Sequence, residues 1–326
     1  MDSEIKVSIC MLAYNHGKYI RKAIESVVNQ KTNFAFELLI HDDASTDNTA
    51  DIIREYEKKY PDIIKPIYQT ENQHNKQIKI SLTYNFPRAK GKYIAMLEGD
   101  DYYTDNHKLQ LQYDILERNP SCSICVHKVA IKNEDLSTNI GYYPSIHFED
   151  GIHKKEEIFD IYLSRVIYLF HTSSYFIRAD VVLSACRNLP EFIKYAPVGD
   201  LPWMLYCALS GDVYYIDRIM SVYRKGSIGS WTDRQKADNN KLRHFNGLKN
   251  MVDVFDEYTD NLYIDFSVPF KKYCGFRIAL IKNDYKSLKK EYSELFNKLS
   301  FKRRILIFCL WLFPFAEKLY LKIRKR

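Results

Sequence analysis

The sequence lacks the cysteine pattern of a disulfide-stabilised or zinc-binding protein. Its 326 residues contain seven cysteines, an odd number, and only Cys122 and Cys125 form a CxxC pair. No second pair and no nearby histidine lie at the spacing that zinc sites use. No secretory signal is recognisable at the N-terminus, so we expect buried, reduced thiols in a cytoplasmic protein.

The sequence also lacks internal repeats, low-complexity linkers and an apolar run long enough to span a bilayer. The apolar run near the C-terminus, from Ile305 to Ala316, has twelve residues, whereas a spanning helix needs about 20. Hydrophobic residues make up 46% of the chain, which is enough for a large core. We therefore expect one large folded unit with an appendage.

Outside the C-terminal segment, the sequence lacks an excess of either charge. The formal net charge is +7, and residues 301–326, with eight Lys and Arg against Glu317, account for all of it. A neutral body does not favour nucleic-acid binding. The basic residues flank Ile305 to Ala316, which predicts an interfacial segment on an anionic membrane surface. The alternative is a helix that docks on the protein itself or on another subunit.

Strands and helices alternate over the first 120 residues. Apolar runs predict buried strands, and helical periodicity predicts helices between them. This alternation predicts an α/β fold with a doubly wound, mostly parallel, Rossmann-like sheet. Residues 122–231 are β-rich with a helix near 200–210 and a loop-forming segment at 220–231, and 236–299 is predicted to form C-terminal helices. The expected strands lie within 6–13, 36–40, 62–69 and 92–97, and helices within 18–30, 49–60, 77–89 and 107–119.

Polar residues follow three of the predicted strands. Because ligands of open α/β sheets bind beyond the carboxyl ends of the strands, we expect these residues to meet at one edge. Three carboxylates within four positions repel one another unless a cation compensates them, and Mg²⁺ and Mn²⁺ prefer such oxygen ligands. The alternative is a solvated turn that caps the helix near 107. The residues are Ala13, Tyr14 and Asn15, then Asp42 and Asp43, then Glu98, Asp100 and Asp101.

Four segments resemble, in order and approximate spacing, the signatures of the inverting family 2 glycosyltransferases. The resemblance covers roughly residues 5–230 and implies a GT-A fold that binds a nucleotide-sugar donor, usually with Mn²⁺ or Mg²⁺. The segments are "VSICMLAYNHGKYIRKAIESVVNQ", "ELLIHDDASTDNTADII", "GKYIAMLEGDDY" and "VGDLPWMLYCALSGDVYYID".

The resemblance implies a role for each matching position. Asp200 would be the catalytic base, although the residues alone favour a helix cap before Pro202. The base pocket would be lined by Ala13, Tyr14 and Asn15; Asp43, with Asp42 beside it, would bind the base, usually uracil; Glu98 and Asp100 would contact the ribose; and Asp100 and Asp101 would hold the metal on the diphosphate.

The sequence departs from the family pattern at several positions. Glu98 replaces the first acid of the Asp-x-Asp, Ala13 a proline, and Gly199 a glutamate, while Tyr84 stands where an arginine is common. The candidate cations for the diphosphate are then Arg224 and Lys225. The alternative is that both are ordinary basic residues of the surface. The Gln-x-x-Arg-Trp of processive members does not occur. We expect His127 and His171 to be core or pocket-wall residues.

Residues and resemblance together predict a domain plan and a function. Residues 1–231 would form the GT-A catalytic domain, with a nucleotide-binding half (1–121) and an acceptor-binding half (122–231), followed by a helical extension (232–300) and the membrane-associating tail (301–326). The predicted activity moves one sugar from a UDP-sugar to a glycan or polyprenyl-linked glycan at the inner membrane face. The alternatives are a glycan-binding scaffold and a sugar nucleotidyltransferase, although "MLAYNHGKYI" lacks the glycine-rich signature of the latter.

Overall fold

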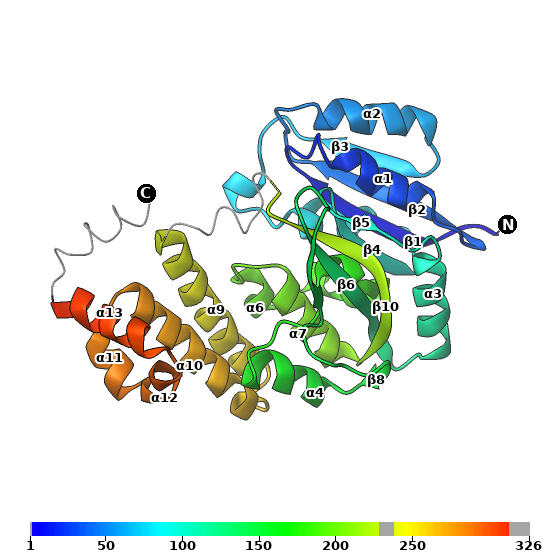
Figure 1. The fold of residues 1–326 in the computed structure, drawn as a ribbon. Helices are drawn as coiled ribbons and strands as arrows, with labels where there is room; N and C mark the ends of the chain where they lie inside the picture. Colours follow the sequence, from blue (N-terminus) through cyan, green and yellow to red (C-terminus); the bar gives the residue numbers. More distant parts are fainter. Residues whose placement is uncertain (1, 228–237, 313–326) are drawn as a thin grey trace.

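The computed structural model describes residues 2–227 and 238–312 (Figure 1). The N-terminal half alternates strands and helices, as the sequence predicts. Its elements are β1 (Asp2–Ala13), α1 (Ile20–Val28), β2 (Phe34–Asp42), α2 (Thr49–Lys59), β3 (Ile64–Tyr68), β4 (Tyr93–Glu98), β5 (Tyr102–Tyr103) and α3 (Lys108–Arg118).

The second half continues the same sheet and ends in helices. Its elements are β6 (Cys122–Asn133), β7 (Asn139–Tyr143), β8 (Gly151–His153), α4 (Lys155–Phe159), β9 (Phe176–Arg178), α5 (Ala179–Arg187), α6 (Glu191–Lys194), α7 (Asp200–Ser210) and β10 (Asp212–Lys225). The helices α9 (Asp238–Tyr258), α10 (Ile264–Ile281), α11 (Tyr285–Lys290), α12 (Ser293–Asn297) and α13 (Phe301–Leu312) follow and gather at one end of the molecule (Figure 1).

One mixed sheet runs through both halves. The strand order in the described residues is β3-β2-β1-β4-β9-β6-β10-β5, with β7 and β8 attached to β6 and β10. Strands β3, β2, β1 and β4 are parallel, whereas β9 runs antiparallel to both β4 and β6. The expected mostly parallel α/β sheet with C-terminal helices is confirmed.

The two faces of the sheet bury different sets of side chains. Because successive strand residues point to opposite faces, Ile9 and Met11 of β1 pack with α1 and α2, whereas Cys10 packs in the cluster on the other face. The cluster that contains Cys10 extends into the C-terminal helices. There, the ring centroid of Phe255 of α9 lies 5.6 Å from that of Phe159 and 5.3 Å from that of Phe192. Burial of these apolar side chains is the main force that holds the layers together.

One expectation about local structure holds only in part and another is wrong. The helix expected at 77–89 is shorter and irregular, with a π-helical turn at Ser81–Asn85 followed by a 3₁₀ turn at Phe86–Arg88. Pro87 has no N–H for a continuous helix, and the Asn85 side chain donates instead to the Met11 carbonyl. The loop expected at 220–231 is strand β10 as far as Lys225. Residues 228–231 of that segment lie outside the described residues.

The cysteines and the histidines follow the expectation. No disulfide joins any of the described cysteines, and Cys122 and Cys125 are buried on β6. His127 is buried on the same strand and its Nδ1 hydrogen bonds to the Lys128 carbonyl. Among the described helices, none combines the length and apolar composition that crossing a bilayer requires.

Candidate active site

The predicted polar residues lie at one edge of the sheet. In the strand register, Ala13 is opposite Asp42 of β2, and Leu12 is opposite Glu98 of β4. Backbone hydrogen bonds continue past the strand ends, from the Asp43 N–H to the Ala13 carbonyl (2.9 Å) and from the Gly99 N–H to the Leu12 carbonyl (2.8 Å). Two acidic segments that are more than fifty residues apart in sequence therefore flank the end of β1.

Gly99 separates the acids because the chain passes close to α1. A Cβ atom at this position would lie 2.9 Å from Cδ1 of Ile20 and 3.1 Å from the Leu12 carbonyl oxygen. These contacts are tighter than packed side chains tolerate, so a larger residue would displace the acidic turn. The glycine thus fixes where Glu98 and Asp100 leave the strand.

The end of β1 is joined to the segment after β2 by side-chain hydrogen bonds. Asn15 has a left-handed backbone with φ of 56°, its N–H donates to Ser45 Oγ (2.9 Å), and Ser45 donates to Asp42 Oδ1 (2.5 Å). Burial raises the pKa of Asp42, and the Ser45 hydrogen bonds oppose that rise. Tyr14 is 38% exposed, so its ring is accessible beside this network.

Asp43 is bound by its own chain. Its Oδ1 accepts the Gln73 N–H (2.7 Å) and its Oδ2 accepts the His74 N–H (3.0 Å). Asn72 Nδ2 donates to the Asp43 carbonyl, and His41 Nε2 lies 3.5 Å from Oδ1. Asp43 is buried, so it anchors the segment that follows β3. No periodicity or motif in "ENQHN" predicts this contact.

The acids after β4 are less well compensated. Burial, followed by the charges of Asp100 and Asp200, raises the pKa of Glu98 to about 8. Burial, followed by the charge of Asp100, also holds the pKa of Asp101 well above its usual range. Asp101 Oδ1 accepts the Arg224 N–H (2.8 Å), and Asp100 Oδ2 accepts Ser227 Oγ (2.5 Å). The charge of Arg224 lowers the pKa of Asp101, whereas the charges that act on Glu98 are those of Asp100 and Asp200, which raise its pKa.

Arg224 does not extend into solvent. It is 6% exposed, and its Nε donates to the Asp100 carbonyl (2.9 Å) while its Nη1 donates to the Glu134 carbonyl (2.5 Å). Its guanidinium also lies over the Tyr19 ring, 4.7 Å from the centroid. Lys225, the next residue of β10, is exposed. The two predicted diphosphate cations therefore differ in their surroundings. Arg224 is buried and hydrogen bonds to the acidic turn, whereas the Lys225 side chain is exposed.

Asp200 lies at the start of α7, beside the acids. It is the first residue of the helix, and its Oδ1 accepts the Leu201 N–H at 2.8 Å. The N-cap of α7 is Gly199, so Asp200 is not the helix cap that the sequence offered as an alternative. Burial raises the pKa of Asp200, and a hydrogen bond from the Tyr168 side chain opposes the rise. Since the charge of Asp200 acts on Glu98, the carboxylate lies toward the acidic turn.

The acidic turn fits a divalent cation that has further ligands from a bound molecule. In the part of the chain that the structure describes, no three His, Cys, Asp or Glu side chains converge to hold a metal by themselves. Burial and the charge of Asp100 raise the pKa of Glu98 and of Asp101, so these carboxyls favour the protonated form, and a bound cation would favour the ionised form. Mg²⁺ and Mn²⁺ commonly use one or two carboxylates together with phosphate oxygens.

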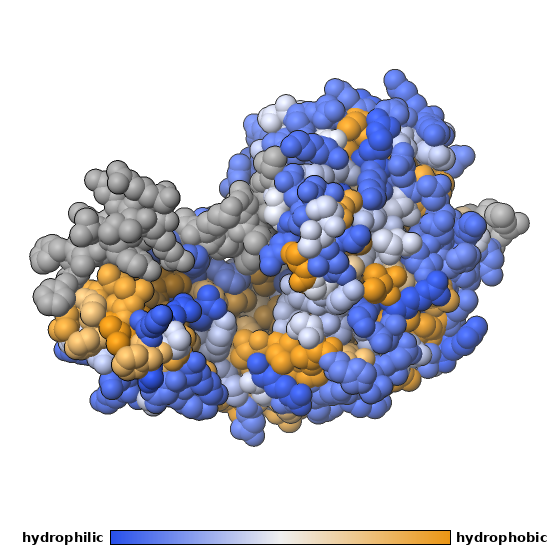
Figure 2. All heavy atoms as spheres, in the orientation of Figure 1, coloured by the Kyte–Doolittle hydropathy of each residue, from blue (hydrophilic) through white to orange (hydrophobic). Residues whose placement is uncertain are grey.

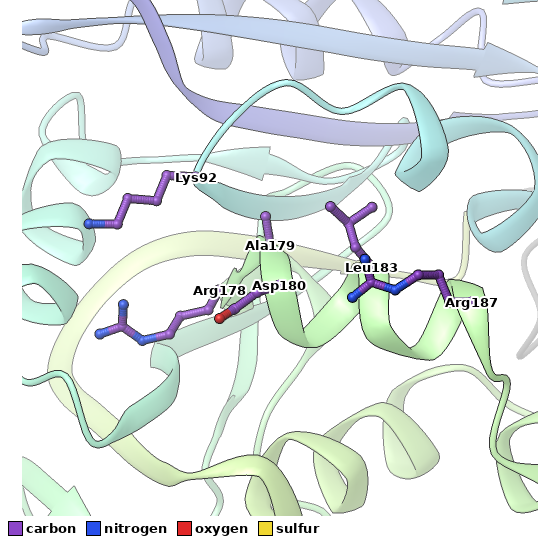
Figure 3. A pocket seen from close by; sticks show the side chains of 6 residues that line it. All are labelled: Lys92, Arg178, Ala179, Asp180, Leu183 and Arg187. Atoms are coloured by element: carbon purple, nitrogen blue, oxygen red, sulfur yellow. The ribbon is translucent and has the colours of Figure 1, made fainter.

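Two cavities lie away from this edge. The first, about 330 Å³, is lined by Lys92 and Arg178 among others, and Lys92 precedes β4, whereas Glu98 ends it. In Figure 3 the side chains of Lys92, Arg178 and Arg187 do not point at a common centre. Arg178 instead donates to the carbonyls of Cys122 (2.7 Å) and Leu116 (2.6 Å). The second, about 1080 Å³, borders Ile5 and Phe34 near the starts of β1 and β2.

Curated relatives share sequence with much of this chain. An uncharacterised protein of Mycobacterium tuberculosis is 33% identical over 241 residues, which are 71% of this chain and 63% of that protein. The poly(ribitol-phosphate) beta-glucosyltransferase of Bacillus spizizenii is 35% identical over 105 residues, 30% of this chain and 15% of that enzyme. The chain thus spans less than two thirds of the length of these relatives.

Two solved structures are similar in fold. S. aureus TarS 1-349 in complex with UDP-GlcNAc matches with a TM-score of 0.57 at 15% identity and covers 93% of this chain and 79% of that one. Mannosyltransferase PcManGT from Pyrobaculum calidifontis, in complex with GDP-Man and Mn²⁺, matches with a TM-score of 0.51 at 14% identity and covers 95% and 88%. The similarity extends over the C-terminal helices as well as the sheet.

A family model matches the part of the chain that holds the acidic edge. The model for glycosyl transferase family 2 aligns with residues 8–176. This range contains β1, β2 and β4 with all the acids that follow them, and it ends in β9. By sequence, fold and the arrangement of its strand ends, the chain belongs to glycosyl transferase family 2.

Proposed function

We propose that the protein transfers one sugar from a nucleotide-sugar, a UDP-sugar in the first instance, to a glycan or lipid-linked glycan acceptor in surface polysaccharide synthesis. One observation carries the proposal: Asp42 and Glu98 end the strands that flank β1, and the charge of Asp200 acts on Glu98. The UDP-GlcNAc bound to TarS and the poly(ribitol-phosphate) acceptor named for the B. spizizenii relative support the donor and acceptor classes.

The donor would lie across the end of β1. Ala13, Tyr14, Asn15, Asp42 and Asp43 form the proposed base pocket, with Asp43 acting partly through the segment that it anchors. Glu98 and Asp100 are proposed to accept hydrogen bonds from the ribose hydroxyls.

The diphosphate would lie between cations. Lys225 is exposed and available. Arg224 uses two of its five N–H donors on backbone carbonyls, so it would contribute through the remaining ones. Asp100 and Asp101 would hold Mn²⁺ or Mg²⁺. When bound, such an ion neutralises charge on the departing nucleoside diphosphate.

Asp200 is the proposed general base. Its carboxylate accepts a proton from the acceptor hydroxyl as that oxygen attacks the anomeric carbon. Attack from the face opposite the nucleotide inverts the configuration in a single displacement, so no covalent glycosyl-enzyme forms. The sequence has no Gln-x-x-Arg-Trp, which favours transfer of one sugar at a time.

A donor screen tests the proposal. Purified protein is incubated with Mn²⁺ or Mg²⁺ and a panel of nucleotide-sugars, with glycan acceptors, and the released nucleotide is identified. We expect nucleoside diphosphate. Release of pyrophosphate would indicate nucleotidyl transfer instead, and no release with any pair would favour the glycan-binding scaffold.

Asp200→Asn tests the base directly. We expect nucleoside diphosphate release to fall at least about 10²-fold, with donor binding retained. Because the base must be deprotonated, release by the wild-type protein should decrease as pH falls through the raised pKa of Asp200. The matched control is Asp180→Asn, since Asp180 also accepts the N–H of its neighbour at a helix start. Equal losses in the two variants would contradict the base role.

The tail is proposed to attach the protein to the inner face of the membrane. In the helical extension, Ile307 of α13 packs with Phe276, Leu288 and Phe296, so α13 docks on the protein through one side. Its other side exposes an apolar stripe, which forms part of the hydrophobic surface at the left of Figure 2. The stripe consists of Phe301 (69% exposed), Ile305 (45%), Phe308 (37%) and Leu312 (46%). Residues 313–326 of the predicted tail lie outside the described residues.

Vesicle flotation tests this attachment. Lys302, Arg303 and Arg304 lie beside the stripe, so we expect binding to vesicles that contain phosphatidylglycerol and weaker binding to phosphatidylcholine alone. Phe301→Ser combined with Phe308→Ser should weaken partitioning into vesicles about 10²-fold or more, since each buried apolar side chain stabilises insertion by about 1.5–3 kcal/mol. Leu262→Ser is the control, because Leu262 is 72% exposed in the turn between α9 and α10. Unchanged flotation of the double variant would refute the attachment.

A further inference from the structure

Four aromatic rings lie together between the acidic turn and Asp200. His171 and Tyr223 are stacked, with ring centroids 4.4 Å apart and an interplanar angle of 26°. Tyr143 lies 6.1 Å from His171 and 6.4 Å from Tyr223. Tyr168 meets Tyr143 edge to face at 4.9 Å. We call these four residues the aromatic wall.

The aromatic wall spans the distance from one group of acids to the other. At one end, His171 Nδ1 lies 3.7 Å from Asp101 Oδ2. At the other end, the Tyr168 side chain hydrogen bonds to Asp200. Tyr143 lies between His171 and Tyr168, and the charge of Asp200 acts on its hydroxyl group. A molecule that reaches from the base toward the acidic turn would therefore pass along these rings.

The aromatic wall differs from the hydrophobic core behind it. Phe170 and Tyr175, its neighbours in the chain, are completely buried, whereas all four wall residues are half-buried. A ring that only filled the core would gain most from complete burial. Partly exposed aromatic rings beside carboxylates match the chemistry of a sugar ring, which has apolar C–H groups on its faces and hydroxyls on its rim.

We propose that the aromatic wall binds the acceptor, with a sugar ring of the acceptor stacked on Tyr143 and its attacking hydroxyl directed to Asp200. This inference rests on the proposed function, because it names the acceptor site of that reaction. Tyr168 then acts as a positioning residue that orients the Asp200 carboxylate. His171 contributes a ring that is stacked on Tyr223.

Saturation-transfer NMR with simple sugars tests the aromatic wall without knowledge of the natural acceptor. The probes are the methyl glycosides of glucose, galactose, mannose and N-acetylglucosamine, added to the full-length protein with UDP present. We expect at least one glycoside to receive saturation on the C–H groups of one ring face. A flat ring is needed for stacking, so Tyr143→Leu should weaken the binding about fivefold, as expected for the loss of roughly 1 kcal/mol.

Two variants control for folding and for the hydroxyl. Tyr143→Phe keeps the ring and should bind like the wild type. Tyr195→Leu removes a tyrosine that is 52% exposed directly after α6, outside the aromatic wall, and should also bind like the wild type. No saturation with any glycoside, or equal binding by Tyr143→Leu and the wild type at equal thermal stability, would overturn the proposal.

The outcome separates the aromatic wall from the proposed function. Turnover of a nucleotide-sugar with no loss of acceptor affinity in Tyr143→Leu would reject the wall and keep the glycosyltransferase activity. Glycoside binding that depends on Tyr143, in a protein that releases no nucleoside diphosphate, would keep the carbohydrate site and reject the activity.

Discussion

Two groups of acids lie at the ends of β2 and β4, the strands that flank β1, and their surroundings differ. After β2, Asp43 is buried and each of its carboxylate oxygens accepts a backbone N–H, from Gln73 and His74. After β4, Glu98 and Asp101 are held with raised pKa values by burial and by the charge of Asp100. The residue type and the sheet edge are the same. What differs is the number of donors: both carboxylate oxygens of Asp43 accept a backbone N–H, whereas Asp101 accepts one, from Arg224.

This difference separates an organising acid from acids that need a cation. A buried carboxylate that accepts two N–H groups is stabilised by charge-assisted hydrogen bonds and fixes the backbone that donates them. Buried carboxylates that face one another without enough donors favour protonation or an external cation. We therefore expect substitutions in the first group to change stability, and substitutions in the second to change metal binding and activity.

The largest expected effect is that of Asp100→Asn. If Asp100 holds the metal, nucleoside diphosphate release should fall about 10²-fold or more, the scale of losing electrostatic stabilisation of a leaving group. Stability without metal should stay equal or increase, because a repulsive charge is removed.

Thermal unfolding with added Mn²⁺ checks the same substitution independently of activity. A ligand at about 100 times its Kd stabilises the folded state by about 2.7 kcal/mol, so the wild type should unfold at a higher temperature with Mn²⁺ and the variant should not. An equal shift in both proteins would show that Asp100 does not bind the metal, and would remove the contrast between the two groups.

The next effect concerns Asp43→Asn and stability. In asparagine one of the two carboxylate oxygens is replaced by an NH₂ group, which cannot accept a hydrogen bond. One of the two backbone donors, Gln73 N–H or His74 N–H, is then left without a partner. We expect a loss of about 1–3 kcal/mol in the free energy of unfolding, measured by urea denaturation. Asp51→Asn is the control, since the Asp51 side chain is 80% exposed and should change stability by less than about 0.5 kcal/mol. Full stability of Asp43→Asn with loss of donor binding would make Asp43 a nucleotide ligand only.

The sequence was sufficient to predict the part of the site that depends on regular structure. Buried strands that alternate with amphipathic helices predict a parallel sheet, and the ends of such strands share an edge. The meeting of Ala13, Asp42 and Glu98 is a direct consequence of that geometry. The fold class was predictable for the same reason, whereas the family was indicated by the resemblance of four segments to known signatures.

The contacts that distinguish the two groups were not predictable. Asp43 is bound by Gln73 and His74 in a segment without periodicity, so nothing in the sequence indicates the pairing. Arg224 is part of a charged run that is typical of an exposed loop, yet it is buried because the carbonyls of Asp100 and Glu134 accept its hydrogen bonds. Backbone acceptors have no sequence signature, and the aromatic wall was missed because Tyr143 and Tyr223 are remote in the chain.

The smallest effect, that of Ser45→Ala, tests whether Asp42 belongs to the organising group. Ser45 joins Asp42 to the Asn15 backbone through 2.5 Å and 2.9 Å hydrogen bonds, so removing its hydroxyl should cost about 1 kcal/mol of stability. The pKa of Asp42, already raised by burial, should rise further, because Ser45 lowers it. The matched control is Thr46→Val, whose hydroxyl makes a longer 3.3 Å contact with Asn15 and should matter less. If Ser45→Ala also weakens UDP binding while the rate at saturating donor is unchanged, Asp42 acts through the shape of the base pocket. A lower rate at saturating donor would instead connect this end of the sheet to the chemical step, and the division between the two groups of acids would fail.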